Sequence, residues 1–152
     1  MLATASIALE GPLGAGKTTF VRHLLHALGV SGRVRSPTFA VLEPYALPRA
    51  DGATLAVSHF DFYRFEDPHE WESAGFRDVF AAPGLKLVEW PERAAGLMPL
   101  PDLTLHLEPT AIDPQARDVT ATAHSAIGLE LLRAWATDAT PPGAARRDEE
   151  PA

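Results

Sequence analysis

A run of residues near the start of the chain has the types and the spacing of a phosphate-binding loop. It reads Gly11-Pro12-Leu13-Gly14-Ala15-Gly16-Lys17-Thr18 and matches the pattern G-x-x-x-x-G-K-[ST] at every fixed position. The glycines let the backbone turn tightly and present consecutive N–H groups to the α and β phosphates of a nucleotide. Lys17 supplies a compact positive charge for the β and γ phosphates, and the Thr18 hydroxyl suits an accompanying Mg²⁺. The motif therefore predicts that the chain binds a nucleoside triphosphate.

The segments on either side of this loop provide the setting that such a loop requires. The apolar run at 6–10 predicts a short strand, and apolar residues at helical spacing from Val21 to Leu28 predict a helix that stops at Gly29. A helix that begins directly after the loop adds the anion-binding dipole of its N-terminus. The alternative is a glycine-rich turn without a ligand. The predicted nucleotide-binding residues of this segment are Gly11, Leu13, Gly14, Ala15, Gly16, Lys17, Thr18 and Thr19.

Carboxylates at the ends of later apolar strands are candidates for the remaining chemistry. Asp61 follows the strand predicted at 54–60, and Glu89 lies near the end of the strand predicted at 85–90. Open α/β sheets bind ligands at the carboxyl ends of their strands, so both side chains are placed to reach a phosphate site. We expect Asp61 to hold Mg²⁺, directly or through water, and Glu89 to orient or activate the attacking water. The alternatives are a strand-capping aspartate and a surface glutamate beside a packed tryptophan.

These assignments give a predicted set of reactive groups. The predicted catalytic residues are Lys17, Asp61 and Glu89, and the predicted metal ligands are Thr18, Asp61 and Glu89. For Glu89, the roles of general base, water-positioning group and metal ligand all stay open. The sequence thus predicts a site in which ATP and Mg²⁺ bind together.

The loop after the first helix contains a further candidate. Ser36-Pro37-Thr38 is expected to be extended, because a proline disfavours helical geometry in the residue before it. Thr38 is placed to reach the γ phosphate or Mg²⁺ as a residue that senses the nucleotide state, and it joins the predicted nucleotide-binding residues. An ordinary loop threonine fits the sequence equally well.

The order of the predicted elements indicates an α/β domain, a phosphate-loop fold with a mixed, mainly parallel sheet flanked by helices. The domain is predicted to span residues 1–137, and the segment 138–152, rich in proline, alanine and charge, is expected to be a disordered tail. The segment 44–52 is predicted to be a loop. The predicted strands are 6–10, 39–42, 54–60, 85–90 and, as an antiparallel edge pair, 103–107 and 118–123. The predicted later helices are 68–74, 91–95 and 127–135.

Composition excludes several classes of protein. The chain of 152 residues carries 13 basic and 20 acidic residues, for a formal charge of −7, which argues against strong direct nucleic-acid binding. The absence of cysteine excludes disulfides, iron–sulfur clusters and thiolate chemistry. No apolar run approaches membrane-spanning length, so we expect a cytoplasmic protein without a membrane role.

Common classes of nucleotide-binding protein fit the sequence less well. Guanine-specific GTPases read the base with an N-K-x-D element, and this chain contains no asparagine. Small-molecule kinases usually carry an arginine-bearing lid and an acceptor-binding insertion, and neither is obvious here. A small-molecule kinase and a nucleotide-gated interaction module without hydrolysis nevertheless remain as alternatives to an ATPase.

The motifs taken together resemble the bacterial TsaE family, formerly called YjeE. The resemblance spans about residues 7–107. Family members usually have aspartate where Pro12 stands, and they usually carry a strand and a helix before the strand at 6–10. The segments that carry the resemblance are the phosphate loop with Thr19-Phe20, Ser36-Pro37-Thr38-Phe39 with Glu43-Pro44-Tyr45, His59-Phe60-Asp61-Phe62-Tyr63-Arg64, and Val88-Glu89-Trp90-Pro91-Glu92.

The resemblance implies a Mg²⁺-dependent ATPase that is an accessory subunit in tRNA threonylcarbamoyladenosine biosynthesis. The implied partners are the transferase that places threonylcarbamoyl on the tRNA adenosine beside the anticodon and the non-catalytic paralogue of that transferase. Hydrolysis is implied to reset the complex between turnovers, not to make the threonylcarbamoyl group. By motif position, Lys17, Thr18 and Asp61 would bind ATP and Mg²⁺, Thr38 would sense the nucleotide, and Glu89 would be required for hydrolysis.

Overall fold

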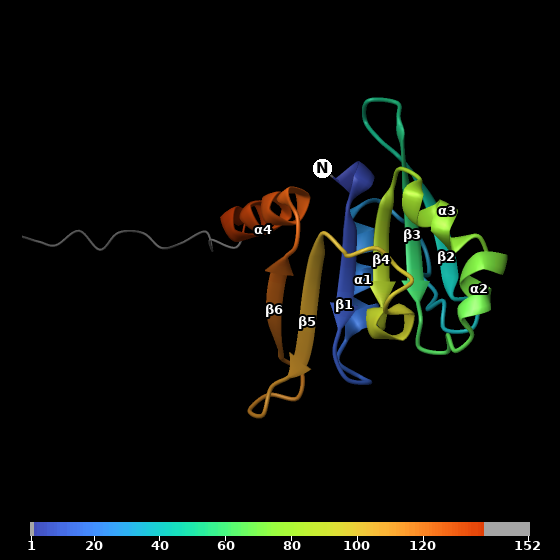
Figure 1. Cartoon of the computed structure of the whole chain (residues 1–152). Helices are drawn as coiled ribbons and strands as arrows, with labels where there is room; N and C mark the ends of the chain where they lie inside the picture. Colours follow the sequence, from blue (N-terminus) through green and yellow to red (C-terminus); the bar gives the residue numbers. More distant parts are fainter. Residues whose placement is uncertain (1, 139–152) are drawn as a thin grey trace, which may run out of the picture.

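Strands that alternate with helices form a mixed β-sheet covered by helices (Figure 1). The computed structural model describes residues 2–138, and within this range no helix is long and apolar enough to cross a membrane. The six strands lie in the order β2-β3-β4-β1-β5-β6. Their bounds are β1 Ser6–Glu10, β2 Leu42–Pro48, β3 Thr54–Asp61, β4 Leu85–Glu89, β5 Leu103–Pro109 and β6 Arg117–Ala123. The helical segments are η1 Leu2–Thr4, α1 Lys17–Ala27, α2 Pro68–Ser73, α3 Phe76–Ala81, η2 Pro91–Ala94 and α4 Ala126–Asp138.

The central strands run parallel, and an antiparallel strand forms each edge of the sheet. β1 pairs in parallel with β4 and β5, and β3 pairs in parallel with β4. β2 is antiparallel to β3, and β6 is antiparallel to β5. The predicted α/β class, the mainly parallel sheet and the antiparallel edge near the C-terminus are therefore confirmed. The second antiparallel edge, β2, was not expected.

The edge strand β2 corrects the sequence-based assignment in this region. The predicted strand at 39–42 and the first half of the predicted loop at 44–52 are both wrong, because β2 begins only at Leu42 and then continues through the loop. Pro44 and Pro48 favoured a loop in the sequence. An edge strand pairs on one side only, so it tolerates residues that have no N–H to donate.

Smaller corrections concern the ends of helices. Helix α3 was not predicted, because Gly75 indicated a helix end. In the structure Gly75 follows α2 and also caps α3, in the left-handed conformation with φ of 72°. Asp138, placed in the expected tail, is the last residue of α4, and the rest of that expected tail, 139–152, lies outside the described residues.

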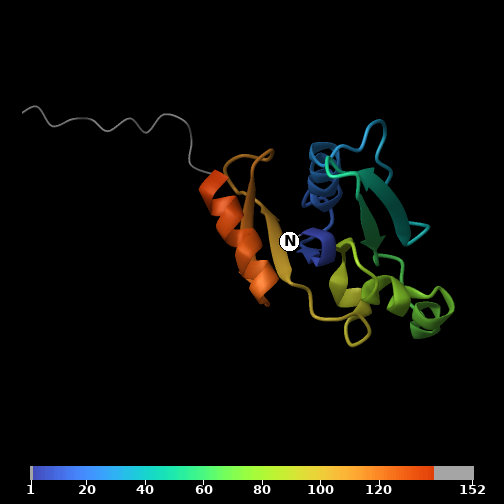
Figure 2. The ribbon, with the colours of Figure 1, turned by 90° about the horizontal axis from the view of Figure 1, so that it is seen from above.

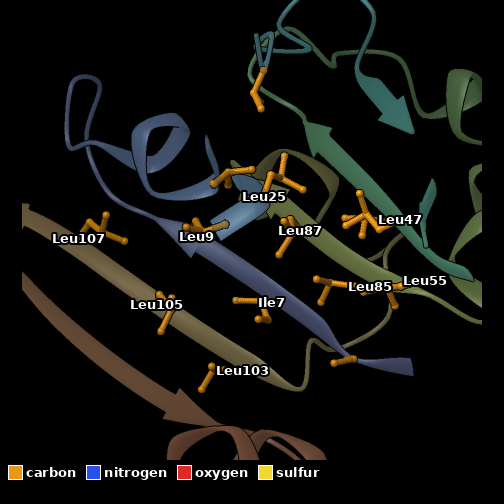
Figure 3. Close-up of a cluster of buried hydrophobic side chains, with 14 of the residues drawn as sticks. Ile7, Leu9, Leu25, Leu47, Leu55, Leu85, Leu87, Leu103, Leu105 and Leu107 are labelled. Atoms are coloured by element: carbon orange, nitrogen blue, oxygen red, sulfur yellow. The ribbon is translucent and has the colours of Figure 1, made fainter. Parts of the chain in front are cut away.

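Alternation along the strands sorts the buried side chains into a cluster on each face of the sheet. One cluster, shown in part in Figure 3, packs against α1 and α4 and includes Ile7, Leu9, Val21, Leu25, Leu87 and Leu105. The other packs against α2, α3 and η2 and includes Phe60, Trp71, Phe76, Val88 and Ala94. Seen from above, α1 and the pair α2 and α3 lie on opposite sides of the sheet (Figure 2).

The same alternation decides which polar residues face α1. Val57 of β3 belongs to the cluster beneath α1, so His59 and Asp61, two and four residues further on, point to the same side. Leu87 of β4 also belongs to that cluster, so Glu89 follows on the same face. Three polar side chains at the strand ends therefore lie beneath the start of α1.

The phosphate loop begins where β1 leaves the sheet beside β5, and only glycine fits there. Gly11 has φ of 143°, and an added Cβ would overlap the carbonyl oxygen of Leu107 in β5.

We expect Gly11→Ala to lower the free energy of unfolding by about 2–4 kcal/mol, because both backbone strain and overlap must be relieved. Urea denaturation measures this loss.

Gly96→Ala is the matched control for this prediction. Gly96 also has a positive φ, 81°, but no atom lies within 4 Å of an added Cβ. We expect a loss of only about 1 kcal/mol, from the left-handed backbone alone. Equal losses for Gly11→Ala and Gly96→Ala would contradict a close approach of the loop to β5.

Candidate nucleotide-binding site

The phosphate loop joins β1 to α1 and lines a pocket at the carboxyl ends of the parallel strands. Gly16 caps α1 in the left-handed conformation, with φ of 97°, where a side chain would be strained. The N–H of Ala15 donates to the carbonyl oxygen of Pro12 at 3.1 Å and closes the turn. The first N–H groups of α1 have no acceptor within the helix. The loop therefore offers backbone donors and the positive end of a helix dipole to an anion.

Lys17 is folded back onto this loop. Its Nζ donates to the carbonyl oxygens of Gly11 at 2.5 Å and Pro12 at 2.9 Å, and it lies 4.0 Å from the centroid of the Trp90 ring. The side chain is only 5% exposed. Burial lowers the pKa of the Lys17 ammonium, while nearby carboxylates, Glu89 foremost, act in the opposite direction. A positive charge with so little solvent gains strongly from an anion placed beside it.

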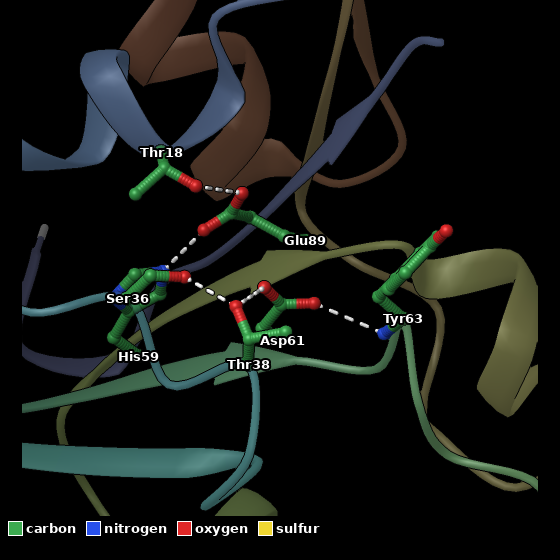
Figure 4. Close-up of polar contacts among 7 residues, drawn as sticks. All are labelled: Thr18, Ser36, Thr38, His59, Asp61, Tyr63 and Glu89. Carbon is green, nitrogen blue, oxygen red and sulfur yellow. Dashed lines mark hydrogen bonds and ion pairs between the residues drawn. The ribbon is translucent and has the colours of Figure 1, made fainter. Parts of the chain in front are cut away.

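Glu89 lies at the centre of the site, where donors from separate elements hold its carboxylate (Figure 4). The Thr18 hydroxyl donates to Oε1 at 2.7 Å, and Nε2 of His59 lies 2.6 Å from Oε2. The Glu89 side chain is 2% exposed. Asp61 is the register partner of Glu89 on the neighbouring strand, so the two carboxylates lie at adjacent strand ends. The fold thus brings together Thr18, Asp61 and Glu89, which the sequence predicted separately.

Asp61 connects the sheet to the loop that contains Thr38. The backbone N–H of Tyr63 donates to Oδ1 at 3.0 Å, and the Thr38 hydroxyl donates to Oδ2 at 3.4 Å. The hydroxyls of Thr38 and Ser36 are also hydrogen-bonded, at 2.8 Å. Burial raises the pKa of Asp61, and the charge of Glu89 raises it further, while the Tyr63 N–H lowers it. A cation beside Asp61 would therefore stabilise a carboxylate that is costly to ionise here.

These groups line one pocket of about 370 Å³. Of the residues that the sequence predicted, all except Gly11 line it, and Gly11 contributes its carbonyl oxygen to Lys17. The individual roles of these residues stay predictions. The lining residues are Leu13, Gly14, Ala15, Gly16, Lys17, Thr18, Thr19, Ser36, Thr38, Asp61, Tyr63, Glu89, Trp90 and Arg117.

Arg117 is a pocket residue that sequence analysis missed. From the start of β6, its Nε donates to the carbonyl oxygen of Ala15 at 2.8 Å, and a terminal nitrogen donates to that of Gly14 at 3.4 Å. The other terminal nitrogen donates to the carbonyl oxygens of Pro114 and Ala116, each at 2.8 Å. The guanidinium ties the phosphate loop to the β5–β6 hairpin. No local signal marks it, because Ala15 is 102 residues away in the sequence.

Trp90 forms another wall of the pocket. Its backbone is left-handed, with φ of 57°, and it caps the short helix η2. Its ring centroid lies 5.0 Å from that of Tyr63, and Lys17 approaches the same ring. Such a backbone is unusual for a bulky residue, and strained residues of this kind cluster at functional sites. Sequence analysis named Trp90 only as part of the segment Val88-Glu89-Trp90-Pro91-Glu92, and its position directly after Glu89 was the available signal.

The donor set fits a nucleotide together with a cation. The hydroxyl of Thr18 and the carboxylates of Asp61 and Glu89 are the hard oxygen ligands that Mg²⁺ takes. Within residues 2–138, no group of three or more His, Cys, Asp or Glu side chains is arranged to hold a metal by itself. Mg²⁺ rarely needs such a cage, because it completes its shell with phosphate oxygens and water. Lys17 and Arg117 also line the pocket and give it positive charge, which a phosphate group would require.

Comparison with known proteins identifies the family. The family model described as "Threonylcarbamoyl adenosine biosynthesis protein TsaE" matches residues 1–119. This chain belongs to the TsaE family. The matched range contains the phosphate loop, both strand-end carboxylates and Arg117, so the TsaE match covers the whole pocket.

Individual TsaE relatives are similar over most of the chain. A Haemophilus influenzae protein named "tRNA threonylcarbamoyladenosine biosynthesis protein TsaE" is 35% identical over 129 residues, which are 85% of this chain and 77% of that protein. A Bacillus subtilis protein of the same name is 36% identical over 117 residues, 77% of this chain and 68% of that protein. The crystal structure of Bacillus subtilis YdiB superposes with a TM-score of 0.65 and 28% identity, over 88% of this chain and 78% of that one.

The raised pKa of Asp61 predicts how the stability of this TsaE chain depends on pH. Burial disfavours the ionised carboxylate of Asp61 in the folded state, so the pKa of Asp61 is higher in the folded than in the unfolded chain. The folded state is therefore favoured while Asp61 is protonated, and this contribution to the free energy of unfolding is lost as the pH rises through the raised pKa. We therefore expect Asp61→Asn to unfold at a higher urea concentration than the wild type at neutral pH without Mg²⁺. The gain should shrink as the pH falls through that raised pKa toward the usual aspartate pKa.

Asp118→Asn is the control, because Asp118 is exposed on β6. We expect no comparable gain in the free energy of unfolding for this variant. Urea denaturation over a pH series, with EDTA present, measures both variants. If Asp61→Asn were less stable than the wild type at neutral pH, burial would not be the dominant influence on Asp61.

Proposed function

We propose that this chain is a Mg²⁺-dependent ATPase and an accessory subunit of the complex that adds threonylcarbamoyl to the tRNA adenosine next to the anticodon. The observation that carries the proposal is the convergence of Lys17, Thr18, Asp61 and Glu89 on one pocket. The names of the TsaE relatives, which refer to tRNA threonylcarbamoyladenosine biosynthesis, support the pathway. The proposed partners are the threonylcarbamoyl transferase and its non-catalytic paralogue, and a cytoplasmic location would follow from this role.

The phosphate loop and Lys17 are proposed to bind the triphosphate. The Lys17 ammonium now bonds loop carbonyls, and its flexible stem lets it turn toward the β and γ phosphates. Arg117 holds the loop carbonyls of Gly14 and Ala15, which keeps the loop in shape for its N–H groups to face the phosphates. When bound, Mg²⁺ supplies charge stabilisation at the phosphates, and Thr18 and Asp61 are the proposed ligands for it.

Glu89 is proposed to orient or deprotonate the attacking water. Each carboxylate oxygen offers two acceptor positions, so the bonds from Thr18 and His59 leave acceptor capacity for a water molecule. The side chain lines the pocket although it is almost fully buried. A carboxylate with little solvent around it acts on a nearby water more strongly than one on the surface.

Thr38 is proposed to link nucleotide state to partner binding. Its hydroxyl bonds both Ser36 and Asp61, so a γ phosphate or cation that competes for these groups would shift the loop. Exposed apolar side chains accompany this loop: Phe39 is 84% exposed, and Leu13 on the phosphate loop is 74% exposed. A partner that covers them would exclude water from the phosphates and strengthen the charge interactions in the pocket.

Variants of Lys17 and Glu89 should separate binding from turnover. We expect Lys17→Ala to lose nucleotide binding and hydrolysis while it stays folded, because Lys17 contacts the loop and not the apolar core. We expect Glu89→Gln to bind ATP but to release phosphate about ten- to a thousand-fold more slowly. Calorimetry with a non-hydrolysable ATP analogue and a phosphate-release assay give the two readouts.

Glu130→Gln on the exposed side of α4 is the matched control for Glu89→Gln. It should leave both readouts at the wild-type level. Normal hydrolysis by Glu89→Gln in the assembled complex would reduce Glu89 to a structural residue. Unchanged binding by Lys17→Ala would remove the basis for the phosphate-loop assignment.

Partner proteins should stimulate hydrolysis. Because Leu13, which lines the pocket, and Phe39, which follows Thr38, are both exposed, we expect the isolated chain to be a slow ATPase that the transferase pair activates by covering them. Steady-state phosphate release with and without the reconstituted pair, alongside pull-downs in ATP and ADP, measures this coupling. Equal rates and nucleotide-independent association would contradict the accessory-subunit mechanism.

A phosphorylated metabolite in place of free phosphate would favour a kinase, and ATP-dependent association without turnover would favour a nucleotide-gated module.

A further inference from the structure

His59 is a buried ionisable residue for which the proposed ATPase mechanism gives no role. It lies in β3, is 0% exposed, and does not line the nucleotide pocket. Its Nε2 lies 2.6 Å from Oε2 of Glu89, and its Nδ1 is buried without any hydrogen-bond partner. The residues around His59 on this face are the apolar Val57 of β3 and Leu87 of β4 and the acidic Asp61 of β3 and Glu43 of β2. Leu87 and Glu43 are the register partners of His59. Among the described residues, Glu89 is nevertheless the hydrogen-bond partner of the His59 side chain.

The chemistry of the pair fixes the direction of the hydrogen bond. An ionised carboxylate can only accept, so the Nε2–H of His59 donates to Glu89. The unpaired Nδ1 then carries a lone pair, because a second N–H would be buried with no acceptor. Close packing in the sheet leaves the imidazole little freedom to turn away. The unpaired Nδ1 makes the buried His59 imidazole unfavourable for stability. Its presence is therefore better explained by its one hydrogen bond, to Glu89, than by a stabilising role.

We propose that His59 is a positioning residue that holds the Glu89 carboxylate toward the pocket by donating from Nε2 to Oε2. The inference rests on the ATPase function proposed above. The other donor, Thr18, belongs to α1 beside the phosphate loop and is itself a proposed Mg²⁺ ligand. His59 comes from the strand beside Glu89 and does not contact the pocket, so it anchors Glu89 whether or not nucleotide is bound. His59 therefore acts on the attacking water through Glu89 alone.

Three substitutions of His59 test whether the position of the donor matters. His59→Gln places an amide N–H₂ close to the position of Nε2, and the only hydrogen-bonding atom of the imidazole that it fails to replace there is Nδ1, which has no partner. His59→Asn carries its amide near the position of Nδ1, which points away from Glu89. His59→Met has similar bulk and no donor. Steady-state phosphate release by the complex with the transferase pair gives kcat and the KM for ATP for each variant.

We expect His59→Gln to keep kcat within about threefold of the wild type, whereas His59→Asn and His59→Met lower it by about ten- to a hundred-fold. The KM for ATP and the affinity for a non-hydrolysable analogue should change little, because His59 does not line the pocket. Circular dichroism and urea denaturation establish that each variant is folded. A purely structural residue would not show rescue by glutamine together with failure of asparagine.

A double variant gives an independent readout. If His59 acts through Glu89, then His59→Met should cause no further loss of kcat when Glu89→Gln is already present, although it lowers kcat alone. Additive losses would overturn the proposal, and so would wild-type kcat in a folded His59→Met variant. The wild-type complex serves as the control for the ATPase itself: no turnover there would overturn the proposed function, and the positioning role with it. Turnover in the wild type with unaffected His59 variants would overturn the positioning role alone.

Discussion

The burial of ionisable side chains at one end of the sheet is the constraint on which the rest of this structure depends. Lys17, His59, Asp61 and Glu89 are each 5% exposed or less. Charges removed from water are unfavourable unless they are paired and hydrogen-bonded. Burial raises the pKa of Asp61 and lowers the pKa of Lys17, so both charged forms are disfavoured in the free chain. A phosphate beside Lys17 would stabilise the charged ammonium, and a cation beside Asp61 would stabilise the charged carboxylate. Burial of these ionisable side chains thus lowers the stability of the free chain and, for the same reason, favours the binding of a charged ligand.

The strand order creates this arrangement. β4 lies between β1 and β3, so the carboxyl end of β4, with Glu89, is flanked by the phosphate loop on one side and by Asp61 on the other. Side-chain alternation then turns His59, Asp61 and Glu89 toward α1, whose first turn carries Thr18. The apolar cluster beneath α1 holds the helix against the same face. The same strands therefore pack the apolar core beneath α1 and position the polar residues of the site.

The C-terminal part of the fold contributes to the site as well. Arg117 at the start of β6 satisfies carbonyl groups of the phosphate loop, which would otherwise point to solvent beside a nucleotide. β5 continues past His106, the register partner of Glu10 in β1, to Pro109, and β6 pairs antiparallel with it so that Arg117 lies opposite Pro109. The TsaE family model extends to residue 119 and so includes Arg117. An edge hairpin in this chain thus supports the phosphate loop, in addition to completing the sheet.

The sequence by itself determined the parts whose signal is local. The phosphate loop, the helix after it, and the carboxylates Asp61 and Glu89 were all predictable, because their chemistry depends on neighbours a few residues away. Only the tertiary structure shows that Leu42–Pro48 forms the strand β2, because only an edge position tolerates Pro44 and Pro48 within a strand. It also decided the roles open to Arg117 and His59. Their partners lie 102 and 30 residues away in the chain, and only the pairing of strands brings them within hydrogen-bond distance.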